Sequence, residues 1–262
     1  MNEKYSQIVL VGHLPQKLIF SIDKEITHKV IFITEKKPLP GTPEAKKILK
    51  ELIKYYEDRK IPAQNVEFDF HIQTKPIAEL THLIYQQKLQ GLNDITINIS
   101  GGLRYMVIWL YIACSITNTR IIHGDFIYEG SKEVGIYSNM NIPTIPFQLI
   151  TDKQFEFLDL FFNSYDNCRD FFNPDLSFND NPLLFNRKKY RSLEEIKGAL
   201  ENKRNGSLSR GSINGFVQKL SKISAINIYP NPKDKKEKTI EISYIGIAYF
   251  IHKLFLKPKT KY

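Results

Sequence analysis

The sequence has little cysteine and no long uninterrupted apolar run. Its 262 residues include two cysteines, Cys114 in an apolar segment and Cys168 in a polar one. Two thiols cannot build a disulfide framework or a four-ligand zinc site, and a reducing cytoplasm is the expected compartment. We expect no metal ion and no cofactor. No apolar stretch approaches the roughly 18 residues that span a bilayer, and the start (MNEKYSQIVLVG) lacks a signal-peptide pattern, so no membrane partner is expected.

The positive charge of the chain is concentrated at one end. The net charge is +9, from 37 Lys and Arg against 28 Asp and Glu. Residues 183–262 hold 18 of those basic and 6 of those acidic side chains, whereas residues 1–182 hold the remaining 19 and 22. The two parts of the chain therefore have different expected partners, and the basic part suits a polyanion.

Residues 1–140 alternate short β-rich runs with longer helical patterns, which predicts an α/β domain with a Rossmann-like, mostly parallel sheet. The predicted strands are residues 8–11, 29–34, 66–72 and 95–99, and the predicted helices begin near Thr42, Pro76 and Leu103. The helix over 103–116 is apolar enough that we expect it to be buried. Residues 120–128 and 134–137 flank a short turn and predict a terminal β-hairpin.

Two glycine-containing turns follow strands of this sheet. One is Gly12-His13-Leu14, and the other is Ser100-Gly101-Gly102-Leu103-Arg104, which leads into a helix. The free amides of a helix N-terminus, with glycines that allow close approach and an arginine nearby, favour an anion site at the carboxyl edge of the sheet. The alternative is a tight turn in which Ser100 caps the helix. Neither turn is a P-loop or a complete dinucleotide-binding fingerprint, and no catalytic residue is assigned.

After a predicted linker and connecting helix over 141–186, residues 187–262 show the order helix, helix, strand, charged loop, strand, helix. This is the order of a winged helix-turn-helix, with a capping box at Ser192 and Glu195. The second helix and the charged loop supply the candidate DNA-binding residues: Ser209, Arg210, Ser212, Asn214, Lys219, Lys233, Lys235, Lys236 and Lys238. The alternative for the loop is a solvated hairpin tip, but its position between two strands and the local basicity favour DNA.

The pattern Ser100-Gly101-Gly102-x-Arg104 at the end of the fourth predicted strand resembles that of the CRISPR-associated Rossmann fold (CARF) family. With a winged helix behind it, the chain is similar to archaeal CARF/winged-helix transcriptional regulators of CRISPR loci. The resemblance implies a homodimer that binds a cyclic oligoadenylate, most often cyclic tetra-adenylate, across its two-fold axis. It places the ligand on Gly12, His13, Leu14, Ser100, Gly101, Gly102, Leu103 and Arg104.

Two other function classes remain open at this stage. Some CARF proteins cleave the ring or carry an effector nuclease. The Arg and His spacing of a HEPN ribonuclease is absent around His252. The Glu-x-Lys pattern of a restriction-like nuclease occurs at Glu195-Ile196-Lys197, but it is predicted to lie in a capped helix rather than a strand. The basic domain could also bind a CRISPR protein or its RNA. A ligand-responsive, double-stranded-DNA-binding antiviral regulator is the expected function.

Overall fold

The computed structural model describes residues 4–38, 41–92, 94–145, 147, 149–166, 168–230 and 238–256. The chain divides into two compact units, Met1–Phe147 and Gln148–Tyr262. Lys233, Lys235 and Lys236, which the sequence assigns to a DNA-binding loop, lie outside the described residues.

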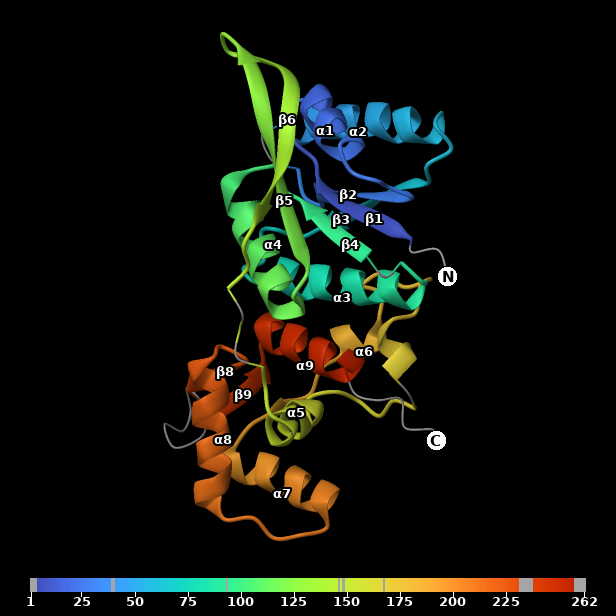
Figure 1. Cartoon of the computed structure of the whole chain (residues 1–262). Coiled ribbons are helices and arrows are strands. Elements are labelled where there is room, and N and C mark those ends of the chain that lie inside the picture. Colours follow the sequence, from blue (N-terminus) through green and yellow to red (C-terminus); the bar gives the residue numbers. More distant parts are fainter. Residues whose placement is uncertain are drawn as a thin grey trace. The chain divides into compact units, whose positions relative to one another are not determined.

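Unit 1 is built on a six-stranded sheet in the order β3-β2-β1-β4-β5-β6 (Figure 1). The strands are β1 (Tyr5–Leu10), β2 (Lys29–Glu35), β3 (Ala63–Phe68), β4 (Asp94–Asn98), β5 (Arg120–Glu129) and β6 (Lys132–Ile142). Every neighbouring pair is parallel except β5 and β6, which form an antiparallel hairpin. This confirms the Rossmann-like, mostly parallel sheet with a terminal hairpin. The order reverses between β1 and β4, where ligands bind in open α/β sheets.

Helices cover both faces of this sheet. They are α1 (Pro15–Asp23), α2 (Thr42–Glu57), α3 (Lys75–Leu89) and α4 (Arg104–Thr117), with α1 packed on α2 and α3 on α4. Alternate residues of the central strands, such as Val9 and Phe32, join a core with Leu18 of α1 and Leu52 of α2. The residues between them, such as Ile8 and Ile31, are also fully buried, as expected when both faces are covered.

Three sequence-based expectations for unit 1 are corrected. The third strand lies at Ala63–Phe68 rather than 66–72, because the chain turns at Asp69, whose carbonyl accepts the Ile72 amide. The nine-residue helix α1 was not predicted, although Pro15 stands in its first turn. Helix α4 is not buried all round, since Ile108 is 55% exposed; apolar composition does not show whether a second surface covers a helix.

Unit 2 combines short helices with a three-stranded antiparallel sheet in the order β7-β9-β8. Its elements are α5 (Asp152–Asp159), η1 (Cys168–Phe171), α6 (Pro182–Phe185), β7 (Lys189–Tyr190), α7 (Leu193–Arg204), α8 (Arg210–Lys222), β8 (Ile226–Pro230), β9 (Lys238–Ile242) and α9 (Tyr244–Leu256). From α7 onward, the order of helices and strands is the one that the sequence predicts. The Ser192 hydroxyl accepts the Glu195 amide as expected, but the Glu195 carboxylate accepts the Arg191 amide instead of closing the capping box.

The sequence predicts a linker and a connecting helix over residues 141–186. The helix is present as α5, and aromatic side chains of this segment pack in the core of unit 2. The ring centroids of Phe155 and Phe162 lie 4.8 and 4.2 Å from that of Phe250 in α9, and Phe157 stacks on Phe216 of α8 at 5.7 Å. The division falls after Phe147 because these aromatic side chains anchor an otherwise polar sequence to the helices that follow.

Candidate functional site

The turns after β1 and β4 lie against each other at the point where the strand order reverses. A methyl group on Gly101 would lie 2.4 Å from the Leu10 carbonyl oxygen and 2.8 Å from the Gly12 nitrogen. A methyl group on Gly12 would lie 2.9 Å from the Gly102 nitrogen, and Gly102 has a φ of +80°. Gly12 and Gly101 therefore require glycine for backbone contact and Gly102 requires it for its positive φ, and the two predicted turns form one structure.

All four helices of unit 1 begin at this edge of the sheet without a side-chain cap; α3 follows Thr74, and the other three follow residues with no polar side chain. The N-cap residues of α1, α2 and α4 are Leu14, Gly41 and Leu103, and none of them accepts a hydrogen bond from the first turn of its helix. In α5, α6, α7 and α8 of unit 2, by contrast, a Thr, Asn or Ser side chain caps the helix. Ser100 does not cap α4. Within the described part of the chain, the amides of Gly102, Leu103 and Arg104 donate no hydrogen bond to protein, which leaves them available for an anion.

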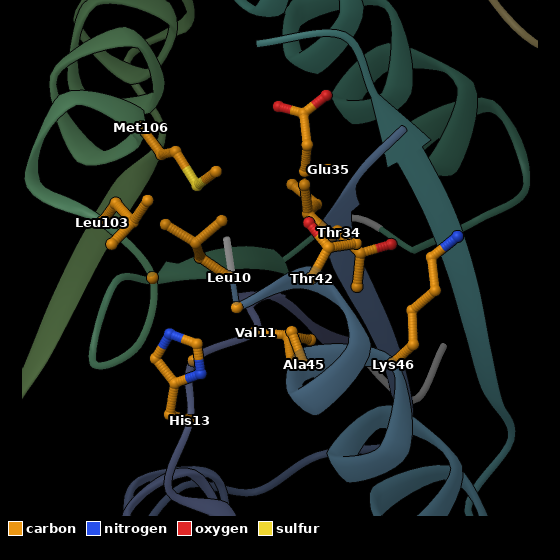
Figure 2. A pocket seen from close by; sticks show the side chains of 14 residues that line it. Leu10, Val11, His13, Thr34, Glu35, Thr42, Ala45, Lys46, Leu103 and Met106 are labelled. Atoms are coloured by element: carbon orange, nitrogen blue, oxygen red, sulfur yellow. The ribbon is translucent and has the colours of Figure 1, made fainter. Parts of the chain in front are cut away.

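A pocket opens beside these turns, on the side of β2 (Figure 2). Its walls come from the ends of β1 and β2, the first turn of α2 and the start of α4: Leu10, Val11, Gly12, His13, Ile33, Thr34, Glu35, Gly41, Thr42, Ala45, Lys46, Gly102, Leu103 and Met106. Of the predicted ligand residues, Gly12, His13, Gly102 and Leu103 line it. Leu14 and Arg104 are exposed and lie outside the lining, and Ser100 and Gly101 are packed behind the turn.

The residues that sequence reasoning missed are chiefly those from β2 and α2. Figure 2 shows Leu10, Leu103 and Met106 on one side of the pocket and Thr34, Glu35, Thr42 and Lys46 on the other. The position of Thr34 and Glu35 at the carboxyl end of a parallel strand was the available signal, because that edge carries the ligand site in open α/β sheets.

The charged side chains of the pocket are held by the protein. Glu35 is 6% exposed, and its carboxylate oxygens accept the Lys37 amide at 2.9 Å and the Phe70 amide at 3.2 Å. The Lys46 ammonium lies 3.2 Å from Glu67. Burial and the Glu35 carboxylate together raise the pKa of Tyr105 above its ordinary value. His13 packs on Gly41, where a methyl group would lie 2.6 Å from the imidazole Cε1.

Behind the pocket, Ser100 belongs to a buried hydrogen-bond network. Its hydroxyl accepts the Gly124 amide at 2.9 Å and lies 3.0 Å from the Ser21 hydroxyl. Ser21 donates to the Asn139 side-chain oxygen at 2.8 Å and accepts from Asn98 at 2.9 Å, so Ser100 is the donor to Ser21. The network fixes the glycine turn to α1 and to the β5–β6 hairpin.

Replacing Ser100 with alanine is expected to lower the free energy of unfolding of unit 1 by about 1–3 kcal/mol, because the Gly124 amide loses its acceptor in a buried position. Urea denaturation followed by fluorescence of the single tryptophan, Trp109 in α4, measures it. The matched control is Ser138→Ala on the exposed side of β6, with an expected change within about 0.5 kcal/mol. Equal effects of the two substitutions would contradict the role of Ser100.

In unit 2, the candidate DNA-binding residues of α8 lie on its exposed face. Arg210, Ser212, Asn214 and Lys219 are exposed, whereas Ile213, Val217 and Leu220 are buried. Ser209 is the N-cap; its hydroxyl accepts the Ser212 amide at 3.1 Å and contacts the Ser212 hydroxyl at 2.9 Å. The Arg210 Nε lies 3.4 Å from Glu194, and both side chains are largely exposed. Lys238 begins β9 and is exposed.

Among the described residues, no group of three or more His, Cys, Asp or Glu side chains is arranged to hold a metal ion. A search of the same residues finds no helix that is both long and apolar enough to cross a membrane.

The fold and the site define unit 1 as an α/β domain with a pocket at its topological switch point. No protein-family model and no curated protein matches the sequence. Among solved structures, the chain is similar to protein VC1899 from Vibrio cholerae, with 13% identity and a TM-score of 0.39 over 96% of this chain and 65% of that one. It is also similar to Can2 from Sulfobacillus thermosulfidooxidans in complex with cyclic tetra-adenylate, with 12% identity and a TM-score of 0.34 over 94% and 61%. The chain spans less than two thirds of the length of either protein, and structural similarity with these TM-scores supports no statement about function.

Proposed function

We propose that this protein is a CARF-type transcriptional regulator in which unit 1 binds a cyclic oligoadenylate, with cyclic tetra-adenylate as the expected ring, and unit 2 binds double-stranded DNA. The main observation that supports ligand binding is the contact of the Gly12 turn with the Gly101–Gly102 turn at the switch point of the sheet. There, the uncapped amides of α4 and the adjacent pocket suit a nucleotide, with phosphate on the amides and the nucleoside in the pocket.

A homodimer completes such a site. Helix α4 leaves Leu103, Tyr105 and Ile108 exposed directly after the glycine turn. Tyr111 of α4 donates a hydrogen bond to the Pro143 carbonyl, which holds the segment after β6 against this helix. Pairing of this apolar face about a two-fold axis would bring two sets of turns together, which suits a symmetric ring with four phosphates.

Replacing Arg104 with alanine is expected to weaken binding of cyclic tetra-adenylate by at least about 10-fold, because the guanidinium at the start of α4 adds charge beside the free amides. Titration calorimetry measures the change. The control is Arg59→Ala, the same substitution just beyond the C-terminal end of α2, which should leave the affinity unchanged. Unchanged binding by Arg104→Ala would contradict the assigned site.

Chromatography of the ring after incubation separates binding from cleavage. His13 lines the pocket and could act as an acid or base, so product formation lost in His13→Ala would favour the alternative, a ring nuclease. Recovery of intact ring is the result expected of a regulator.

The geometry of unit 2 supports a winged helix-turn-helix. Helices α7 and α8 are joined by a short turn, and the sheet order β7-β9-β8 places two antiparallel strands after the second helix. In this arrangement, α8 would lie in the major groove with its exposed polar face toward the bases, and the segment between β8 and β9 would be the wing. The excess of basic residues in this part of the chain favours contact with the phosphate backbone.

The double substitution Arg210→Ala and Lys219→Ala is expected to reduce the slope of log affinity against log salt by about 2, since each phosphate contact contributes roughly 0.9. Gel shifts of a duplex across a salt series measure this slope. Lys50→Ala, an exposed lysine of α2 in unit 1, is the control and should leave it unchanged. Equal slopes for the double variant and wild type would instead favour a protein or RNA partner for unit 2.

A further inference from the structure

A buried carboxylate lines the pocket that the proposed function assigns to the nucleoside of a polyanionic ligand. Glu35 is the last residue of β2, and its carboxylate is fixed by the amides of Lys37 and Phe70. Each carboxylate oxygen has two acceptor sites, so both oxygens can accept a further hydrogen bond. A carboxylate repels phosphate, so the ligand group that suits this wall is one that donates a hydrogen bond.

The position of Glu35 at the end of β2 indicates that the donating group of the ligand is a ribose hydroxyl. In sheets with the strand order 3-2-1-4-5-6, phosphate lies at the first turn and an acidic residue about 20 residues further on accepts a hydrogen bond from a ribose hydroxyl. Glu35 stands in this relation to the turn at Gly12. Figure 2 shows the apolar side chains of Leu10, Leu103 and Met106 in the facing wall, where they offer a surface for a base.

We propose that the pocket is a ribonucleoside subsite in which the Glu35 carboxylate accepts a hydrogen bond from a ribose 2′-hydroxyl while the base lies against the apolar wall. The inference rests on the proposed function and adds to it which ligand group the pocket recognises, namely the ribose 2′-hydroxyl. It makes the site selective for ribonucleotides over deoxyribonucleotides.

The test compares cyclic tetra-adenylate with its 2′-deoxy analogue by titration calorimetry. Wild-type protein is expected to bind the ribose ring about 10- to 100-fold more tightly, the range for a hydrogen bond to a charged group. The preference should fall to about 1-fold in Glu35→Ala. Because Glu35→Ala leaves two backbone amides without their acceptor, Glu35→Gln is measured as well, and its neutral amide should keep a preference below about 10-fold.

Glu44→Gln is the matched control, since it removes one negative charge from the exposed first turn of α2 without touching the pocket lining. This variant should retain the wild-type preference. The measured quantity is a ratio of two affinities for one protein, so a general loss of repulsion or of stability does not produce the expected result.

Equal binding of both rings by wild type, or an unchanged preference in both Glu35 variants, would overturn the inference while the proposed function stands. If neither ring binds, the proposed function fails, and adenosine and 2′-deoxyadenosine 5′-monophosphates decide the subsite. A Glu35-dependent preference for the ribonucleotide then supports it. Equal binding or no binding of the monophosphates would overturn it too.

Discussion

Replacing Gly101 with alanine is expected to abolish binding of cyclic tetra-adenylate and to lower the free energy of unfolding of unit 1 by about 3 kcal/mol. The added methyl group would meet the Leu10 carbonyl oxygen at 2.4 Å and the Gly12 nitrogen at 2.8 Å. Both are backbone atoms of the neighbouring turn, so they cannot rotate away as a side chain could. The two turns must separate, which displaces the amides that would hold phosphate.

Calorimetry with the ring and urea denaturation followed by Trp109 fluorescence measure the two effects. Gly135→Ala is the matched control, because a methyl group on Gly135 of β6 would meet only the Ile127 Cδ1 at an ordinary 3.4 Å. Near-wild-type stability and ring binding in Gly101→Ala would show that the turns are not in contact as described.

Replacing Gly246 with alanine is expected to destabilise unit 2 by about 3 kcal/mol and to abolish DNA binding. Gly246 lies in the first turn of α9, where a methyl group would stand 2.0 Å from the Ala225 carbonyl oxygen. That carbonyl accepts the Ser243 amide, and Gly246 donates to the Ser243 hydroxyl, so the clash falls within a fixed set of hydrogen bonds. Ala225 connects α8 to β8, and its displacement would move the proposed DNA-contacting helix.

Hydrogen exchange of peptides from α7, α8 and α9 follows this loss of stability directly. In Gly198→Ala, the methyl group would meet nothing within 4 Å on helix α7, so the substitution should stabilise the unit by roughly 0.5–1 kcal/mol. Opposite signs for the two variants are the expected result. Faster exchange in both, or in neither, would contradict the packing of α9 on Ala225.

Strands and helices could be predicted from the sequence where the spacing of their own apolar residues shows which faces are buried. The apolar run Val30–Ile33 indicated a strand covered on both sides, and α2 shows its apolar face at regular spacing. The end of β3 could not be predicted, because it depends on the last hydrogen bond to β2, from the Lys36 amide to the Phe68 carbonyl. The segment before β7 was predicted as a linker because it is rich in Asn and Asp, and the packing of its phenylalanines on Phe250 of α9 joins residues far apart in the sequence.

The candidate site divides in the same way. The glycine turns are visible in the sequence, since consecutive glycines after a strand indicate a turn with close backbone contact or a positive φ, as found at Gly101 and Gly102. The opposite walls with Glu35 and Met106 are not, because those side chains line one pocket only when β2 and α4 are placed on either side of the end of β1. The partners of Ser100 come from α1 and the hairpin, and no local pattern joins them.

Native mass spectrometry of the wild-type protein with cyclic tetra-adenylate tests the central proposal most directly, because it reports chain number and ligand number together. The proposed function predicts two chains holding one intact ring, and loss of the ring in Arg104→Ala. If the protein binds no ring even when cyclic tetra-adenylate is well above the concentration that saturates a specific site, the proposed function is contradicted.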